Sequence, residues 1–241
     1  MLHAIAGSVR AVLRILGMLV VTGALFPFLL AGRTIRRRQR IIRVWARAMA
    51  RCLSLHTTVE GTPPSGGFVL VSNHVSYLDI LLFLQFVDIV FVAMSQLRTV
   101  PVISTVVAAA GTIFIDRSSK RDALRVVGEI ESIVQRGGGV VLFPEATSSD
   151  GKDVLPFKPA LLEAAAREGR PVHYAVLRYR QPGVAWWGDI PLVPQLRGLL
   201  GMPRIDASIE FCGSVTATDR RELAQKLWTE IRERVIDGHT I

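Results

Sequence analysis

Cysteine is nearly absent from this sequence: the chain of 241 residues holds two, Cys52 and Cys212. They lie far apart, and neither belongs to a metal-ligand or thioredoxin-like spacing. A disulfide-stapled scaffold is therefore excluded, and the chain suits a reducing compartment or is indifferent to one. The five histidines form no pair at ligand spacing, and no pairing of carboxylates indicates a metal, so we expect no metal site.

Acidic residues are missing from residues 33–51, which contain eight arginines. These arginines account for all but one unit of the formal net charge of +9, so the basic character is local. They recur every three or four residues beside an apolar face, which predicts a basic amphipathic helix over residues 33–53. Its arginine face either is solvated on its own domain or lies on anionic lipid, and we favour lipid. A nucleic-acid partner is not expected, because no groove-reading motif accompanies the charge.

Charge is also missing from residues 15–32, an apolar run of 18 residues. A helix needs about 20 such residues to cross a bilayer, and Pro27 would kink or end it, so a full span and entry into one leaflet both remain open. We expect residues 1–54 to be membrane-anchoring helices and residues 55–241 to be the catalytic domain. The positive-inside rule places the arginines and that domain at the cytoplasmic face of the inner membrane.

Short apolar runs alternate with helical patterns after residue 55. The alternation predicts an α/β fold with a mostly parallel central sheet and flanking helices. Strands are predicted over residues 68–72, 89–94, 113–116, 140–143, 171–179 and 207–211. Helices are predicted over residues 76–86, 119–136, 160–168 and 219–236.

Two common catalytic motifs are absent. The G-x-S-x-G elbow of serine hydrolases does not occur. Residues 146–153 approach a phosphate-binding Walker A loop, but they lack its first glycine and place Asp153 where a hydroxyl must hold magnesium. A nucleotide-dependent enzyme is therefore not indicated.

A polar segment follows the strand predicted over residues 68–72: Asn73-His74-Val-Ser-Tyr-Leu-Asp79. The junction of a strand end with a helix start is where α/β sheets place their chemistry. We expect the Asp79 carboxylate to come within hydrogen-bond reach of the His74 imidazole, which would make His74 a general base toward a hydroxyl. The segment also fits a capping box, with Ser76 as the N-cap and Asp79 as the third helical residue.

Three more segments are expected at the same edge of the sheet. Residues 111–117 end a strand in Arg117, and residues 140–149 end another in Pro144, Glu145 and a hydroxyl-rich loop. Residues 170–176 supply a further strand. In this order the segments resemble the NH-x4-D, F-I-x-R, F-P-E-G-T and proline-containing blocks of the glycerolipid acyltransferases of the 1-acylglycerol-3-phosphate acyltransferase (PlsC-like) type.

The resemblance implies transfer of an acyl chain from acyl-CoA or acyl-carrier protein to the free hydroxyl of a membrane lysolipid, without a cofactor. It makes His74 the general base and Asp79 its orienting partner. No covalent acyl-enzyme is implied, because neither cysteine lies in a matched block. The residues implied in binding the acceptor are Asn73, Arg117, Glu145, Ala146, Thr147, Ser148 and Lys158. For Lys158, an ordinary surface position is the alternative.

Two departures from the family pattern bear on the acceptor. Ala146 stands where the family usually has glycine, and Ser148 stands where phosphatidate-forming members often carry arginine. Residues 147–158 and Trp186-Trp-Gly-Asp189 are similar to the branch of lyso-ornithine lipid acyltransferases, whose acceptor has no phosphate. Arg117 still favours an anionic head group. The expected acceptor is therefore 1-acyl-sn-glycerol-3-phosphate, and lyso-ornithine lipid or another lysophospholipid is the alternative.

Two other classes of function remain open. A lipid or thioester hydrolase would use the same His74–Asp79 pair to activate water and would need no acceptor. A non-catalytic membrane-binding module would need only residues 1–54 and would leave the four blocks unexplained.

Overall fold

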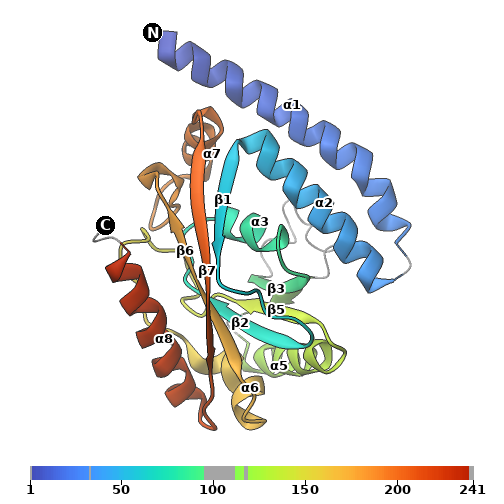
Figure 1. Cartoon of the computed structure of the whole chain (residues 1–241), viewed down its shortest axis with the longest axis vertical. Helices are drawn as coiled ribbons and strands as arrows, with labels where there is room; N and C mark the ends of the chain where they lie inside the picture. Colours follow the sequence, from blue (N-terminus) through green and yellow to red (C-terminus); the bar gives the residue numbers. More distant parts are fainter. Residues whose placement is uncertain (1, 33, 95–111, 117–118, 239–241) are drawn as a thin grey trace.

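The computed structural model describes residues 2–32, 34–94, 112–116 and 119–238. A seven-stranded sheet lies at its centre, with the strand order β1-β7-β6-β2-β5-β3-β4 (Figure 1). All neighbouring strands are parallel except β6 and β7, which are antiparallel. The predicted α/β fold with a mostly parallel sheet is confirmed.

The predicted strands are present, and the structure adds one more. The prediction for residues 68–72 and 89–94 matches β2 and β3 residue for residue. The prediction missed β1, whose alternating, half-exposed residues give a weak pattern, and it made β7 too short. The strands are β1 (Leu55–Glu60), β2 (Phe68–Ser72), β3 (Ile89–Met94), β4 (Ile113–Ile115), β5 (Gly139–Leu142), β6 (Val172–Tyr179) and β7 (Ile205–Val215).

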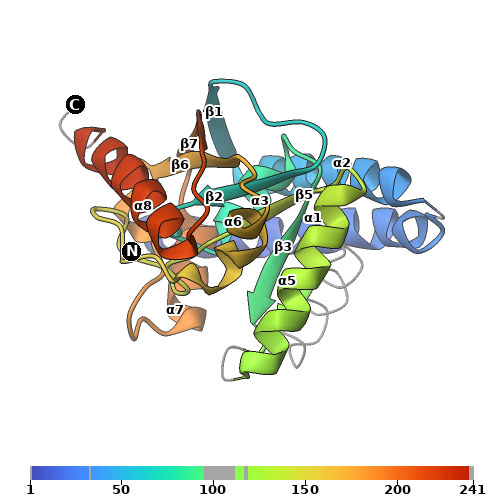
Figure 2. The same ribbon diagram turned by 90° about the horizontal axis from the view of Figure 1, so that it is seen from below.

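The helices cover both faces of the sheet. Successive residues of β2 alternate between two cores: Phe68 and Leu70 face one, and Val69 and Val71 face the other. The first core is covered by α1 (Leu2–Leu30), α2 (Ile35–Leu53), α3 (Leu78–Leu84) and α7 (Leu192–Gly201). The second is covered by α5 (Lys120–Gln135), the 3-10 turn η2 (Pro159–Leu162), α6 (Glu163–Arg167) and α8 (Arg220–Asp237). In Figure 2, α5, α6 and α8 lie in front of α1 and α2.

The basic helix α2 shares the first core of the α/β fold. Its apolar side buries Ala46, Met49 and Leu53 in the same cluster as β1 and α3. Some arginines on its other side contact the body of the protein: Arg43 forms an ion pair with Asp88, and Arg47 donates to a backbone carbonyl. The helix is therefore an integral part of the fold, whereas its contact with lipid stays a prediction.

The apolar helix α1 is longer than the apolar run that predicted it. It begins at Leu2 and continues through Pro27 to Leu30, so of the two predicted effects of Pro27, a kink or an end, the helix does not end at this residue but three residues later. Pro27 lies in the last turn, where its missing N–H removes only one helical hydrogen bond. By length and composition, residues 5–30 are sufficient to cross a membrane, and only 11% of the most apolar window is buried in the protein.

Two arginines of α1 bind the end of α7. Arg14, a residue only 5% exposed, donates from its guanidinium to the carbonyls of Leu200 at 3.0 Å and Met202 at 2.7 Å. Arg10 donates to the Gly201 carbonyl at 2.5 Å. The last carbonyls of a helix lack helical partners and carry partial negative charge, so cations stabilise this end. These arginines therefore attach α1 to the end of α7.

We expect the Arg14→Met variant to be less stable than the wild type by about 2 kcal/mol, because buried carbonyls would lose a charged donor. Chemical denaturation in detergent micelles measures this difference. The matched control is Arg40→Met, since Arg40 is exposed on α2. Equal stability of the two variants would contradict this role of Arg14.

Candidate active site

His74 lies two residues after the end of the central strand β2, at the carboxyl edge of the sheet. Its Nδ1 lies 2.7 Å from Oδ2 of Asp79, so the predicted hydrogen bond between the two side chains is confirmed. The imidazole is 23% exposed, whereas the Asp79 side chain is fully buried. With Nδ1–H directed at the carboxylate, Nε2 is the nitrogen that would accept a proton from a substrate.

The Asp79 carboxylate also holds the turn that carries His74. Its Oδ2 accepts hydrogen bonds from the backbone N–H groups of Val75 at 2.7 Å and Ser76 at 3.1 Å. The capping prediction is partly wrong, because α3 begins at Leu78 and the N-cap is Tyr77. Ser76 still accepts from the Leu78 N–H. The same carboxylate thus closes the turn and orients the imidazole.

The sequence prediction missed Tyr179, at the end of β6. Its hydroxyl donates to Oδ1 of Asp79 at 2.7 Å. Burial and the Asp79 charge raise the pKa of Tyr179 well above its usual value of 10, so the hydroxyl stays protonated and remains a donor. No signal in the sequence links residues 100 positions apart, because only the pairing of β6 with β2 brings them together.

Glu145 supports the turn from the neighbouring strand. It is 2% exposed, and its two carboxylate oxygens accept from the N–H of His74 at 2.7 Å and of Leu155 at 2.8 Å. Burial raises the pKa of this carboxyl to about 7, although the N–H donors favour the charged form. This placement favours a positioning role over the predicted contact with the acceptor head group.

Asn73 is placed in a similar way. Its side chain is buried, with Oδ1 accepting from the Leu177 N–H at 2.8 Å and Nδ2 donating to the Leu177 carbonyl at 2.9 Å. The amide therefore joins the ends of β2 and β6. As with Glu145, the geometry favours a structural role over the predicted substrate contact.

The loop after β5 lies beside this turn. The Ser149 N–H donates to the His74 carbonyl at 2.8 Å. Ala146 has φ +64, a left-handed conformation that costs an L-residue energy and that would suit the glycine of the F-P-E-G-T block that this segment resembles. Thr147 is exposed, and the half-buried Ser148 donates its hydroxyl to the Trp186 carbonyl. The Lys158 side chain is exposed, while its N–H bonds the Pro144 carbonyl.

Phe143 supports the imidazole from one side. Its ring stacks on His74 with centroids 4.3 Å apart and planes 19° apart, and it also stacks on Phe91. The apolar Phe143 ring restricts the rotation of the imidazole.

Arg117 was predicted to bind the head group of the acceptor. It lies outside the described residues, two positions after the end of β4 at Ile115.

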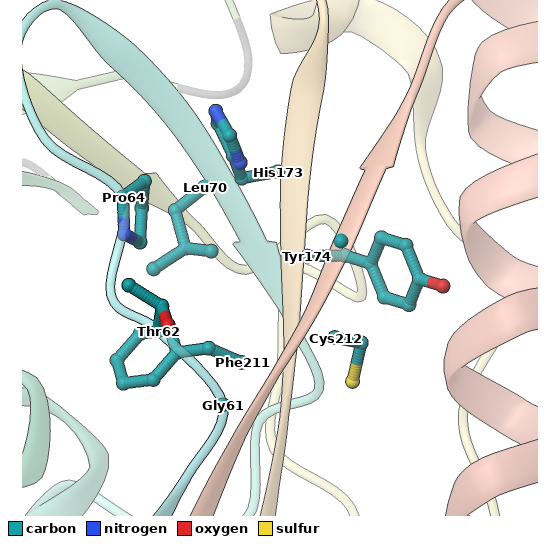
Figure 3. A pocket seen from close by; sticks show the side chains of 9 residues that line it. Gly61, Thr62, Pro64, Leu70, His173, Tyr174, Phe211 and Cys212 are labelled. Carbon is teal, nitrogen blue, oxygen red and sulfur yellow. The ribbon is translucent and has the colours of Figure 1, made fainter.

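A separate pocket of about 370 Å³ lies at the other end of β6. Figure 3 shows His173, Leu70 and Pro64 on its wall. His173 and Tyr179 are near opposite ends of the strand, about 20 Å apart at the usual rise per residue. This pocket therefore does not belong to the His74 site.

Within the described ranges, no group of three or more His, Cys, Asp or Glu side chains is arranged to hold a metal ion.

Comparison with known proteins agrees with this geometry. The family model named Acyltransferase matches residues 55–194. The chain is 30% identical to the lyso-ornithine lipid O-acyltransferase of Brucella abortus, covering 94% of each chain. It is 29% identical to the 1-acyl-sn-glycerol-3-phosphate acyltransferase of Neisseria meningitidis, covering 85% of this chain and 84% of that one. The crystal structure of PlsC from Thermotoga maritima matches 99% of this chain and 98% of its own, with a TM-score of 0.74 and 19% identity.

Proposed function

This chain belongs to the Acyltransferase family, and we propose that it transfers an acyl group from a thioester to the hydroxyl of a lysolipid. The observation that carries the proposal is the bond of 2.7 Å between His74 and Asp79 at the carboxyl edge of the sheet. A tautomer fixed in this way leaves Nε2 as the ring nitrogen that can accept the proton of a substrate hydroxyl.

The proposed reaction needs one base and no covalent intermediate on the enzyme. Nε2 of His74 takes the hydroxyl proton while the oxygen attacks the thioester carbonyl, and Asp79 stabilises the imidazolium. When the tetrahedral intermediate collapses, the C–S bond breaks and the thiolate leaves. His74 returns the proton to the sulfur, so the products are an ester and a free thiol. Cys52, on α2, and Cys212, on β7, are not among the groups that contact His74.

For the acceptor we propose lyso-ornithine lipid. The supporting observations are the similarity to the Brucella enzyme over 94% of each chain and the contact of Ser148 with the Trp186 carbonyl. Position 148 is the one at which the resemblance described above would lead us to expect arginine in a phosphatidate-forming enzyme. An ornithine head group has an amine and a carboxylate, and it needs no phosphate site. The second candidate is 1-acyl-sn-glycerol-3-phosphate, which the similarity to the Neisseria enzyme favours.

We further propose that acyl-CoA or acyl-carrier protein supplies the thioester and that the enzyme works at the cytoplasmic face of the inner membrane. The support for the location is the apolar helix α1 followed by the arginines of α2. Arginine-rich segments next to an apolar helix stay on the cytoplasmic side.

Parallel assays test these proposals. Membranes that contain the protein receive labelled acyl-CoA with either lyso-ornithine lipid or lysophosphatidate, and His74→Ala is the control. We expect acylated ornithine lipid from the wild type only. Phosphatidate alone would move the acceptor to the second candidate. Free fatty acid formed without an acceptor would indicate a hydrolase, and product formed by His74→Ala would overturn the catalytic assignment.

A further inference from the structure

Several large apolar side chains are exposed in a short segment that includes α7. Val193 is 75% exposed, although the sequence around it folds into an ordered helix. An apolar patch of this kind on a soluble surface marks a contact with another molecule or with a membrane. We call it the α7 patch; it consists of Trp187, Ile190, Leu192, Val193 and Leu196.

The exposure does not come from a loosely attached helix. The other side of α7 buries Leu199 and Leu200 in the first core. Arg14 fixes its carboxyl end. The patch is therefore held outward by a helix that is anchored on its remaining sides.

The helix that carries the patch packs against α1. The two helices pack where Gly7 meets Gly201, and a Cβ added at Gly7 would lie only 3.9 Å from the Gly201 Cα. Beyond this contact, α1 exposes large apolar residues, among them Leu13 and Val20. Exposed Arg197 adds a cation on α7, as is common in helices that lie at a lipid surface.

The segment that carries the patch is also connected to the catalytic turn. Buried Gln195 accepts a hydrogen bond from the Tyr77 hydroxyl at 2.7 Å, and Tyr77 lies between His74 and Asp79 in the chain. The backbone N–H of Trp186 donates to the Val75 carbonyl at 3.0 Å. These two hydrogen bonds therefore fix the position of the α7 patch relative to His74.

We propose that the α7 patch is a lipid-contacting surface, separate from the N-terminal helices, that seats the catalytic turn at the bilayer surface. The occupant is the lipid bilayer, because α7 packs against α1, the candidate membrane helix, and is bonded to it through Arg14. The proposal rests on the proposed function only in that the acceptor is a membrane lipid. The patch consists of residues that the reaction itself does not use.

A spin label measures the contact directly. Val193→Cys, in full-length protein with Cys52 and Cys212 replaced by Ala, carries a nitroxide in vesicles of phosphatidylethanolamine and phosphatidylglycerol. We expect its collisions with oxygen to increase relative to those with a water-soluble nickel chelate. The matched control is Leu124→Cys, since Leu124 is an equally apolar residue, 63% exposed, on α5 over the opposite face of the sheet. Equal accessibility at both positions would overturn the proposal, and the result does not depend on catalysis.

Activity gives a second measurement. For the variant Val193→Ser/Leu196→Ser we expect at least about a tenfold loss with the acceptor in vesicles and less than about a twofold loss with a dispersed short-chain acceptor. Leu124→Ser should leave both activities unchanged. Equal losses on both acceptors would overturn the proposal. So would a change in oligomeric state in detergent, which would assign the patch to a second copy of the chain.

Discussion

Asp79→Asn is expected to lower kcat for acyl transfer by about a thousandfold or more while the protein remains folded. Asp79 accepts from the His74 imidazole, two backbone N–H groups and the Tyr179 hydroxyl. An amide can accept at only one end, so its NH2 group would oppose one set of these donors. His74 would then lose the partner that fixes its tautomer and stabilises its positive charge.

A double-mutant comparison makes this prediction specific. Because His74 and Asp79 act as a unit, the variant His74→Ala/Asp79→Asn should be no slower than His74→Ala alone. Single-turnover kinetics with saturating donor measure the chemical step. Additive losses in the double variant, or near-normal kcat in Asp79→Asn, would contradict the assignment of the pair.

Tyr179→Phe provides the matched control for this site. It removes one donor to Asp79 without changing the shape of the partly buried ring. The two backbone donors and the imidazole contact remain, so we expect a smaller loss of kcat than in Asp79→Asn, about tenfold. This intermediate effect would distinguish a positioning residue from the base itself.

Glu145→Gln is expected to lower kcat by about a hundredfold, because one of its two backbone contacts would face an NH2 group and the turn would shift. The loss should occur with every acceptor, since the carboxylate binds the His74 and Leu155 N–H groups. A loss confined to KM for one acceptor would instead restore Glu145 to the head-group site predicted from the sequence.

The same variant should change how stability depends on pH. The pKa of the Glu145 carboxyl rises from 4.5 in the unfolded chain to about 7 in the fold. The folded state therefore binds the proton more tightly, and the stability from this group is complete below pH 4.5 and is lost as the pH rises through 7. The difference is on the order of 3 kcal/mol. Denaturation across this range should show the decline in the wild type and a flatter profile in Glu145→Gln.

The sequence was sufficient to predict the parts of the site that depend on local order. The apolar run 68–72 must be a buried strand, and a histidine and a carboxylate five residues apart at its end can meet across one turn. The prediction was weaker wherever a partner comes from distant sequence. The sequence prediction assigned Asn73 and Glu145 to substrate binding. Their hydrogen bonds to the backbone of Leu177 and Leu155 become visible only in the folded structure.

The N-terminal segment illustrates the same limit. Its composition predicted an apolar helix and a basic helix, and both are present. It did not predict that Arg14 binds α7, because α7 itself was missed. Pro194 and the glycines at 198 and 201 lower the helical propensity of that segment, and the packing of its buried side decides its structure.

The position of β2 between β5 and β6 has a consequence for biosynthesis. The ribosome completes β2 early, but Glu145 follows His74 by 71 residues and Leu177 follows Asn73 by 104. At typical rates of about 5–20 residues per second, the nascent chain carries an unpaired apolar strand for several seconds. During that interval His74 has no stacked Phe143 and Asp79 has no Tyr179 donor. The stacked Phe143 ring and the Tyr179 donor of the proposed catalytic pair are therefore in place only after translation has delivered β6.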